Sequence, residues 1–280
     1  MRKKNNALQL SFFIFSLITF SLFSLRFLNN KNPMLAFDYK TPLYNSQETF
    51  DPSLMRLNTV SRLKEYCDSL FKVTNMTNSL DKYESNYTNI VGGVVRKRFY
   101  WGYSYYSFNN NYMAVLFSKF TQWGYAAMVI PDDILKYSNA SCSQQSIVMM
   151  EVLKKNGFIT RKIGFLGNNK IGHFAFEVYY KNNWHFHDPT LEPDTAVLNK
   201  YDRPDIKFIV ERPDILLAAY KEIHKDKSLV LDVFSHYSYG KPNSSLAPNA
   251  FIFHRITKIL SNTIWIFLLM GYFVVKFRQR

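Results

Sequence analysis

The chain has 280 residues and a mass of 33.0 kDa, and 47% of its residues are hydrophobic. This is too apolar for an intrinsically disordered chain, and the length suffices for one sizeable core. The net charge of +14 raises the question of a nucleic acid or an anionic membrane as partner, while the mean hydropathy of −0.19 excludes a polytopic transporter. Two cysteines, Cys67 and Cys142, exclude a disulfide-rich scaffold and a four-thiolate zinc site.

Both ends of the chain are strongly apolar. Residues 7–28 carry no charge before Arg26, which predicts a first transmembrane helix after a short cytoplasmic tail, residues 1–6. A cleaved signal peptide is the alternative, although the apolar run is long for one and no A-x-A-like site follows it. Residues 259–275 predict a second transmembrane helix, with residues 276–280 as a cytoplasmic tail. A buried core helix or an interfacial amphipathic helix is the alternative there.

Basic residues stand beside the outer edge of each apolar run, so the positive-inside rule predicts that both termini are cytoplasmic. Residues 29–258 are then an extracytoplasmic domain, either periplasmic or at the cell surface, and the lipid bilayer is a partner. The basic and aromatic run 96–101 (RKRFYW) is typical of a solvated strand or loop edge. We therefore expect no nucleic-acid partner.

The residue pattern in the first part of this domain predicts helices. Asp51 and Pro52 precede apolar residues spaced by three or four up to Leu70, a pattern typical of an amphipathic helix. Cys67 lies on its apolar stripe, so we interpret it as a core residue, with a disulfide to Cys142 as the alternative. Residues 74–90 and 107–111 are rich in Asn and Ser and predict loops, and a further helix is expected over 111–123.

Cys142 follows a helix-start signal. Ser141 and Gln144 form a capping-box pattern before an apolar helical stripe, and Gly157 is expected to end that helix. Cys142 therefore falls in the first turn, where unpaired backbone N–H groups and the helix dipole favour thiolate over thiol. The same N–H groups could receive an oxyanion.

Two alternating segments follow Cys142. Residues 172–180 and 184–189 have the period-two pattern of strands, and residues 181–183 predict a hairpin turn between them. Antiparallel pairing brings His173, at the start of the first strand, near Asp188, at the end of the second. A thiolate, an imidazole and a carboxylate together meet the requirement for nucleophilic cysteine catalysis.

At these residues the chain resembles the transglutaminase-like superfamily. The matching segments are 142–145 (CSQQ), 157–161 (GFITR), 172–178 (GHFAFEV) and 184–190 (WHFHDPT), within a motif core of residues 140–192. The resemblance implies an α+β, papain-like domain with helices packed on an antiparallel sheet, here flanked by two transmembrane helices. It also implies Cys142 as nucleophile, His173 as general base and acid, and Asp188 as the orienting carboxylate. Trp101 is a candidate oxyanion donor by position alone, with a buried aromatic as the alternative.

The family resemblance implies amide hydrolysis or acyl transfer through a thioester, on a peptide or cell-envelope substrate of a bacterial cell, with no cofactor. The competing function is a non-catalytic module that scaffolds an envelope or polysaccharide-export system, with envelope proteins as partners. A metal site built from His173, His185, His187 and Asp188 is a third alternative. Alternation along the strand disfavours it, because His185 and His187 project from one face and Asp188 from the other. We expect no metal, and we interpret His185, His187 and Glu177 as surface residues.

The last part of the domain carries no recognisable chemistry. A short helix is expected over 213–224, a strand over 229–233, and a linker over 237–249. This region could cover the cleft or bind a partner.

Overall fold

The computed structural model describes residues 2–28, 49–74, 83–120, 127–191, 193–222 and 226–278. The chain divides into two compact units. The terminal unit comprises residues 1–36, 105–128 and 249–280, and the central unit comprises residues 37–104 and 129–248. Residues 105–128, which the sequence places inside one continuous domain, therefore group with the two ends of the chain.

The terminal unit is built from α1 (Arg2–Leu28), α4 (Phe108–Phe120) and α11 (Pro248–Phe277). Helices α1 and α11 are each long and apolar enough to cross a membrane, and only 6% of either apolar window is buried. A core helix of a soluble protein would be mostly buried, so this alternative for the second apolar run is not favoured. The helix is longer than the predicted span 259–275.

Contacts between α1 and α11 are aromatic and polar. The rings of Phe20 and Phe23 contact that of Trp265, and the Ser16 hydroxyl donates to the Trp265 carbonyl at 2.9 Å. Helix α4 is kinked at Asn111, whose side-chain amide donates to Thr257 and accepts from Ser261, both on α11. The predicted helix over 111–123 is thus present, although its last residues lie outside the described ranges.

A four-stranded antiparallel sheet forms the centre of the other unit, in the order β5-β4-β3-β6. Its strands are β3 (Ile159–Leu166), β4 (Gly172–Tyr180), β5 (Asn183–His187) and β6 (Tyr237–Tyr239). A separate two-residue pair, β1 (Tyr100–Trp101) with β2 (Asn139–Ala140), is parallel. The α+β class with helices on an antiparallel sheet is therefore confirmed.

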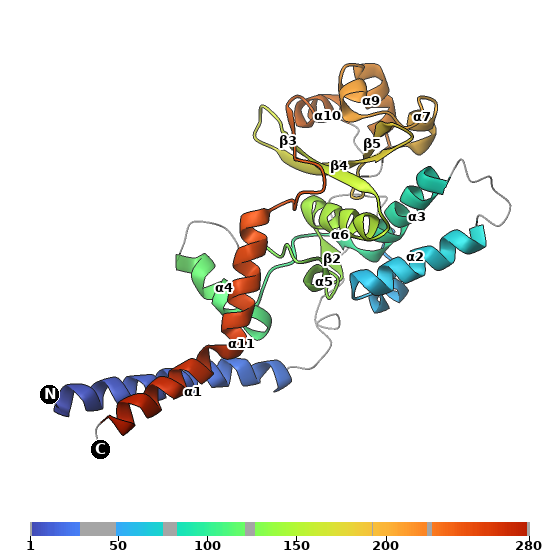
Figure 1. The fold of residues 1–280 in the computed structure, drawn as a ribbon. Coiled ribbons are helices and arrows are strands. Elements are labelled where there is room, and N and C mark those ends of the chain that lie inside the picture. Colours follow the sequence, from blue (N-terminus) through green and yellow to red (C-terminus); the bar gives the residue numbers. More distant parts are fainter. Residues whose placement is uncertain are drawn as a thin grey trace. The chain divides into compact units, whose positions relative to one another are not determined.

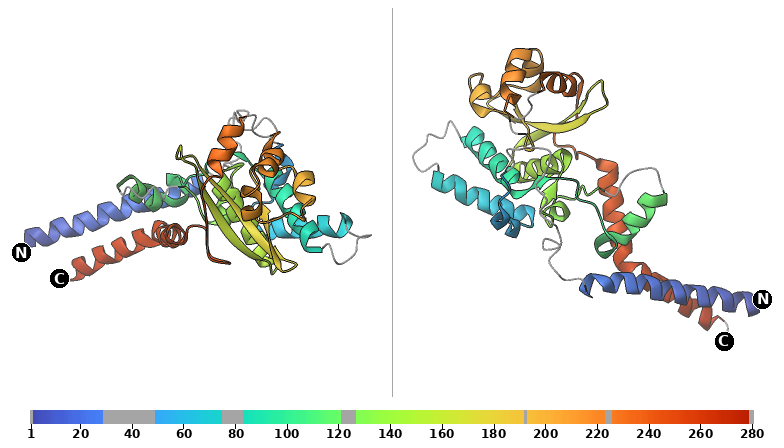
Figure 2. Two further views of the ribbon diagram at one scale, coloured as in Figure 1. Left: turned by 90° about the horizontal axis from the view of Figure 1, so that it is seen from above. Right: turned by 180° about the vertical axis from the view of Figure 1, so that it is seen from behind.

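Helices cover both faces of this sheet (Figures 1 and 2). One face contacts α6 (Cys142–Lys155), which in turn contacts α2 (Val60–Thr74), α3 (Tyr83–Arg98) and α5 (Pro131–Ile134). The short helix η2 (Pro52–Arg56) contacts α3. The predicted helix after Asp51 is thus divided in two, and residues 83–90, predicted as a loop, are helical.

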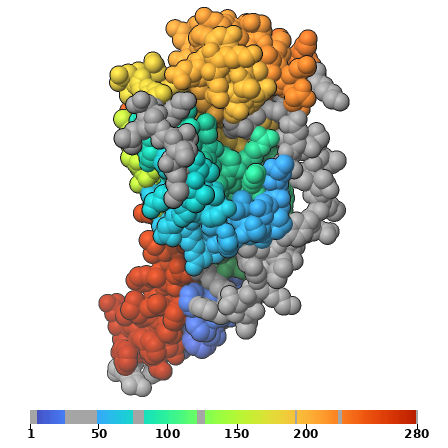
Figure 3. Space-filling model, turned by 90° about the vertical axis from the view of Figure 1, so that its right-hand side faces the viewer, coloured from blue at the N-terminus to red at the C-terminus, as the bar shows by residue number. Residues whose placement is uncertain are grey.

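The other face carries four short helices, α7 (Thr195–Asn199), α8 (Ile206–Val210), α9 (Pro213–Tyr220) and α10 (Lys227–Val233). Their apolar side chains form one buried cluster with Ile163, Phe165, Ala175 and Phe186 of the sheet. In Figure 3 the gold and orange atoms of this segment form a layer above the blue and cyan atoms of α2 and α3. The region that the sequence left without a role is therefore a structural layer over the sheet.

The β4–β5 hairpin fixes the register that matters for the site. Its turn consists of Lys181 and Asn182, both with positive φ (47° and 61°), as a two-residue hairpin turn of type I′ requires. Tyr180 pairs with Asn183 and Phe176 with His187. The predicted hairpin is confirmed, with a turn one residue shorter than expected.

Two predicted elements near the end of the central unit are wrong. Residues 229–233, predicted as a strand, belong to helix α10, whose cap residue Asp226 accepts hydrogen bonds from the N–H groups of Ser228 and Leu229. A short run of apolar residues does not distinguish a strand from a buried helix. Here the N-cap residue Asp226 indicates the helix. Residues 237–239, predicted as linker, form the edge strand β6, which pairs with β3.

Candidate active site

Cys142 is the first residue of helix α6. The side-chain oxygen of Gln144 accepts a hydrogen bond from the Ser141 N–H at 3.2 Å, which is the expected capping contact. At the other end, the N–H groups of Gly157 and Phe158 donate to the carbonyls of Lys154 and Leu153, closing the helix at a glycine with φ of 86°. The predicted helix and the position of Cys142 in its first turn are confirmed.

The start of α6 lies beside the start of β4. Ser146, one turn after Cys142, donates its hydroxyl to the backbone carbonyl of Phe174 at 3.4 Å. His173 is the residue before Phe174, and the Cys142 side chain lies near enough to its imidazole to contribute to that imidazole's raised pKa. Cys142 is partly exposed, whereas His173 is 4% exposed. A partly exposed sulfur therefore contacts a buried imidazole.

Asp188 completes the group. Its Oδ2 lies 2.7 Å from Nε2 of His173, and its side chain is fully buried. The hairpin register explains this contact. Phe176 pairs with His187, so Asp188, the next residue, is level with Ala175. Ala175 is two residues from His173, and the two therefore lie on the same face of the sheet. The structure thus brings together the three residues that the sequence predicted.

Four hydrogen bonds from described residues hold the Asp188 carboxylate. Besides the bond to His173, Oδ1 accepts from the N–H groups of Thr190 (3.2 Å) and Leu191 (3.1 Å), and Oδ2 accepts from the hydroxyl of Tyr220 (3.0 Å). Tyr220 comes from α9 and was not predicted, since no motif surrounds it. A buried carboxylate with this many donors is fixed in position and remains ionised.

Two aromatic rings pack against the imidazole of His173. The Phe165 ring stacks beside His173 with centroids 5.9 Å apart, and the Phe234 ring meets it edge-on at 6.1 Å. These rings exclude water from one side of the imidazole, so its interaction with Asp188 takes place in a medium of low polarity. Electrostatic attraction is stronger there than at the surface.

These surroundings shift the pKa values of the pair in opposite directions. Burial alone would lower the pKa of His173, but Asp188, with a smaller contribution from Cys142, raises it to about 10. Burial would raise the pKa of Asp188, but the positive imidazolium and the hydrogen bonds from Leu191 and Tyr220 hold it below its usual range. The imidazole is therefore protonated and the carboxylate ionised at neutral pH.

The raised pKa of His173 predicts a pH-dependent contribution to stability. The folded state binds the proton more tightly than the unfolded state, so the stabilisation is fully present below pH 6.5, the ordinary value, and is lost as the pH rises toward about 10. We expect the free energy of unfolding of the wild type, relative to that of His173→Gln, to fall across this window by at most about 1.4 kcal/mol per pH unit. Urea unfolding of the full chain in detergent measures it.

The matched control is His236→Gln, which replaces an exposed histidine of the same unit. The fall with pH should be larger for the wild type compared with His173→Gln than for the wild type compared with this control. A difference from His173→Gln that stays constant with pH would mean that the imidazole does not carry the tightly bound proton.

Other predicted candidates lie elsewhere. Cys67 is completely buried on α2, and burial raises the pKa of its thiol to about 12. Both cysteines are free, so the disulfide alternative is not realised in this structure. Trp101 pairs in register with Ala140, two residues before Cys142, which places its backbone beside the strand that leads into α6. Its role at an oxyanion stays a prediction.

The histidines considered as metal ligands are separated by the sheet. His185 and His187 pair with Val178 and Phe176 and are 2% and 1% exposed, whereas His173 and Asp188 belong to the opposite face of the sheet. Within the described ranges, no three His, Cys, Asp or Glu side chains lie close enough to hold a metal ion. His187 is neutral at pH 7 because burial lowers its pKa, an effect to which Arg203 and His185 add. The interpretation of both histidines as surface residues is wrong.

Two further charged residues are buried, contrary to expectation. Glu177 is fully buried, pairs with Arg161 at 2.6 Å and accepts from the Ile206 N–H, so it ties β3, β4 and α8 together. Arg98, from the basic run, is buried and donates to the carbonyls of Leu135 and Tyr137. Buried charges persist where such partners satisfy them, which alternating polarity alone does not reveal.

Comparison with protein-family models, with curated proteins and with solved structures gave no match for this chain.

Proposed function

We propose that this protein is a membrane-anchored cysteine enzyme of transglutaminase type, which cleaves or transfers an acyl group at an amide. The observation that carries the proposal is that one imidazole contacts both the sulfur of Cys142 and the carboxylate of Asp188. Cysteine nucleophiles that work with a base need this arrangement: a sulfur at a helix start, a histidine beside it and a third group that orients the histidine.

The proposed reaction has two steps. The Cys142 thiolate attacks the amide carbonyl, and the resulting oxyanion is received by backbone N–H groups of the first turn of α6, which have no partner within the helix. The His173 imidazolium then gives its proton to the leaving nitrogen as the C–N bond breaks, which leaves a thioester. Water or an amine then attacks this thioester and gives its proton to His173, and the Cys142 thiolate leaves, which restores the starting thiolate and imidazolium.

The membrane location has separate support. Two helices of the chain are long and apolar enough to cross a bilayer. Basic residues at both outer ends favour cytoplasmic termini, which would place the central unit in the periplasm or at the cell surface. A peptide or an amide-bearing polymer of the cell envelope would be the substrate available there.

Acylation by an activated ester tests the proposed reaction. The purified full chain is mixed with p-nitrophenyl acetate, and its mass is measured with time. In the wild type we expect an acetyl group on Cys142 that neutral hydroxylamine removes. The Cys142→Ala variant should carry no such acetyl group, and the His173→Gln variant should be acetylated more slowly. Attack by a thiolate on the ester releases p-nitrophenolate and leaves the thioester, so both products can be followed.

Adding methylamine separates the outcomes. Faster loss of the acetyl group with formation of N-methylacetamide indicates acyl transfer, and loss at an unchanged rate indicates hydrolysis. An acetyl group that stays on Cys142 would favour the alternative, a non-catalytic module that uses the fold for binding. Acetylation of Cys142 that is equally fast without His173 would contradict the proposal.

A further inference from the structure

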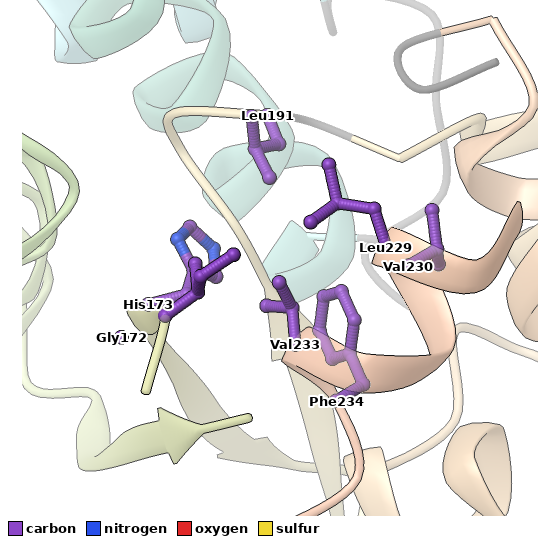
Figure 4. A pocket seen from close by; sticks show the side chains of 8 residues that line it. Gly172, His173, Leu191, Leu229, Val230, Val233 and Phe234 are labelled. Carbon is purple, nitrogen blue, oxygen red and sulfur yellow. The ribbon is translucent and has the colours of Figure 1, made fainter. Parts of the chain in front are cut away.

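A small apolar pocket lies beside His173, between the sheet and α10. Its volume is about 160 Å³. Figure 4 shows His173 on one side of the pocket and the side chains of α10 on the other, with Leu191 between them at the top of the view. The apolar lining residues are Ile171, Leu191, Leu229, Val230, Val233 and Phe234.

The imidazole of His173 thus belongs both to the candidate active site and to the wall of the pocket. The ring meets Asp188 through Nε2, the sulfur of Cys142 lies near it, and the ring itself lines the pocket. A group bound in the pocket would therefore touch the side chain that must exchange a proton with the substrate. Such an occupant lies one side chain away from the sulfur of Cys142.

We infer that this pocket binds an apolar side chain or acyl group of leucyl to phenyl size, adjacent to the reacting amide of the substrate. The inference rests on the proposed function. The size follows from the volume, because an apolar protein cavity of about 150 Å³ holds one benzene molecule. Among the described lining residues His173 is the one polar side chain, and its charge is already paired with Asp188. A charged or strongly hydrated group would lose its water without compensation there.

The walls of the pocket are held together. Asp232, on α10, accepts hydrogen bonds from the N–H groups of Asn168 and Asn169, which belong to the β3–β4 connection. This connection contributes Ile171, so both walls are fixed relative to each other. Val230 and Phe234 are almost fully buried at the base, whereas Ile171 is 43% exposed at the rim. A pocket that exists before binding needs little ordering when it is filled.

The depth of the pocket predicts a size preference. Enzyme pockets discriminate by about 10-fold or more for each missing methylene of an apolar substrate group. A substrate with a leucyl-sized group should therefore react faster than one with a methyl group. A naphthyl-sized group exceeds the volume and should lose the advantage.

The experiment measures the alkylation rate of Cys142 in the full chain, reconstituted in lipid nanodiscs. Three probes are compared: iodoacetamide, its N-benzyl derivative and its N-(2-methoxyethyl) derivative, which is extended but polar. We expect N-benzyl iodoacetamide to react about 10-fold faster than the other two. The Val233→Trp variant, which fills the pocket, should bring the ratio of the N-benzyl to the methoxyethyl rate close to one.

The matched control is Leu231→Trp. Leu231 is on the same helix and 40% exposed, but it does not line the pocket, so this variant should keep the wild-type ratio. If Val233→Trp does not fold, Leu229→Asp at the pocket rim replaces it and should lower the same ratio.

The outcomes separate this inference from the proposed function. Equal rates for the N-benzyl and methoxyethyl probes, together with fast labelling by iodoacetamide that depends on His173, would overturn the pocket and leave the function intact. Slow labelling that does not depend on His173 would overturn the function. In that case, an N-benzyl preference that Val233→Trp abolishes would still establish the pocket as a binding site.

Discussion

Replacing His173 by glutamine should slow the alkylation of Cys142 by iodoacetamide about tenfold at pH 7. An unassisted thiol is only a few per cent thiolate at this pH, and only the thiolate reacts. In the wild type the His173 imidazolium, whose pKa Asp188 raises to about 10, lies beside the sulfur and attracts the negative charge that the sulfur carries when it reacts. Glutamine carries no such charge.

Site-resolved mass spectrometry measures this rate, and the chain supplies an internal reference. Cys67 is completely buried, and the pKa of its thiol is raised to about 12, so it should label slowly in every variant. His236→Gln, at an exposed position, serves as the control substitution. Equal rates for Cys142 in the wild type and in His173→Gln would mean that the histidine does not activate the sulfur.

Replacing Asp188 by alanine should lower the free energy of unfolding by about 3–5 kcal/mol, the cost of removing one partner from a buried ion pair. The change leaves His173 without its counter-charge. It also leaves the Tyr220 hydroxyl and the N–H groups of Thr190 and Leu191 without their acceptor. Chemical denaturation of the full chain in detergent, at pH 7, measures the loss.

Tyr220→Phe is the matched comparison, because it removes one of these hydrogen bonds and keeps the ring. We expect it to cost about 0.5–1.5 kcal/mol. If Asp188→Ala costs no more than Tyr220→Phe, the carboxylate is not the centre of the network that the distances indicate.

Local patterns predicted the elements of the site because each depends on nearby residues. The capping signal around Ser141 and Gln144 placed Cys142 in the first turn of α6, and alternation over 172–180 and 184–189 located the hairpin. Hairpin pairing then brought His173 and Asp188 together without further information. Contacts between residues close in sequence, or joined by a tight turn, are those that periodicity and turn chemistry determine.

Contacts over longer separations were not predictable in this way. Tyr220 reaches Asp188 from 32 residues away, and Glu177 binds the N–H of Ile206, 29 residues away. The apolar run 229–233 suited a strand as well as a buried helix, so the pocket between α10 and the sheet could not be anticipated. The local signal for the helix was its cap residue, Asp226.

The claim that Cys142, His173 and Asp188 act as a unit is tested most directly by repeating the acetylation measurement on His173→Gln, Asp188→Asn and the double variant. If Asp188 acts through His173, its replacement slows acetylation in the wild-type background but has no further effect once His173 is gone. The account predicts that the double variant reacts as fast as His173→Gln alone. A double variant slowed by the product of the two single effects would contradict it.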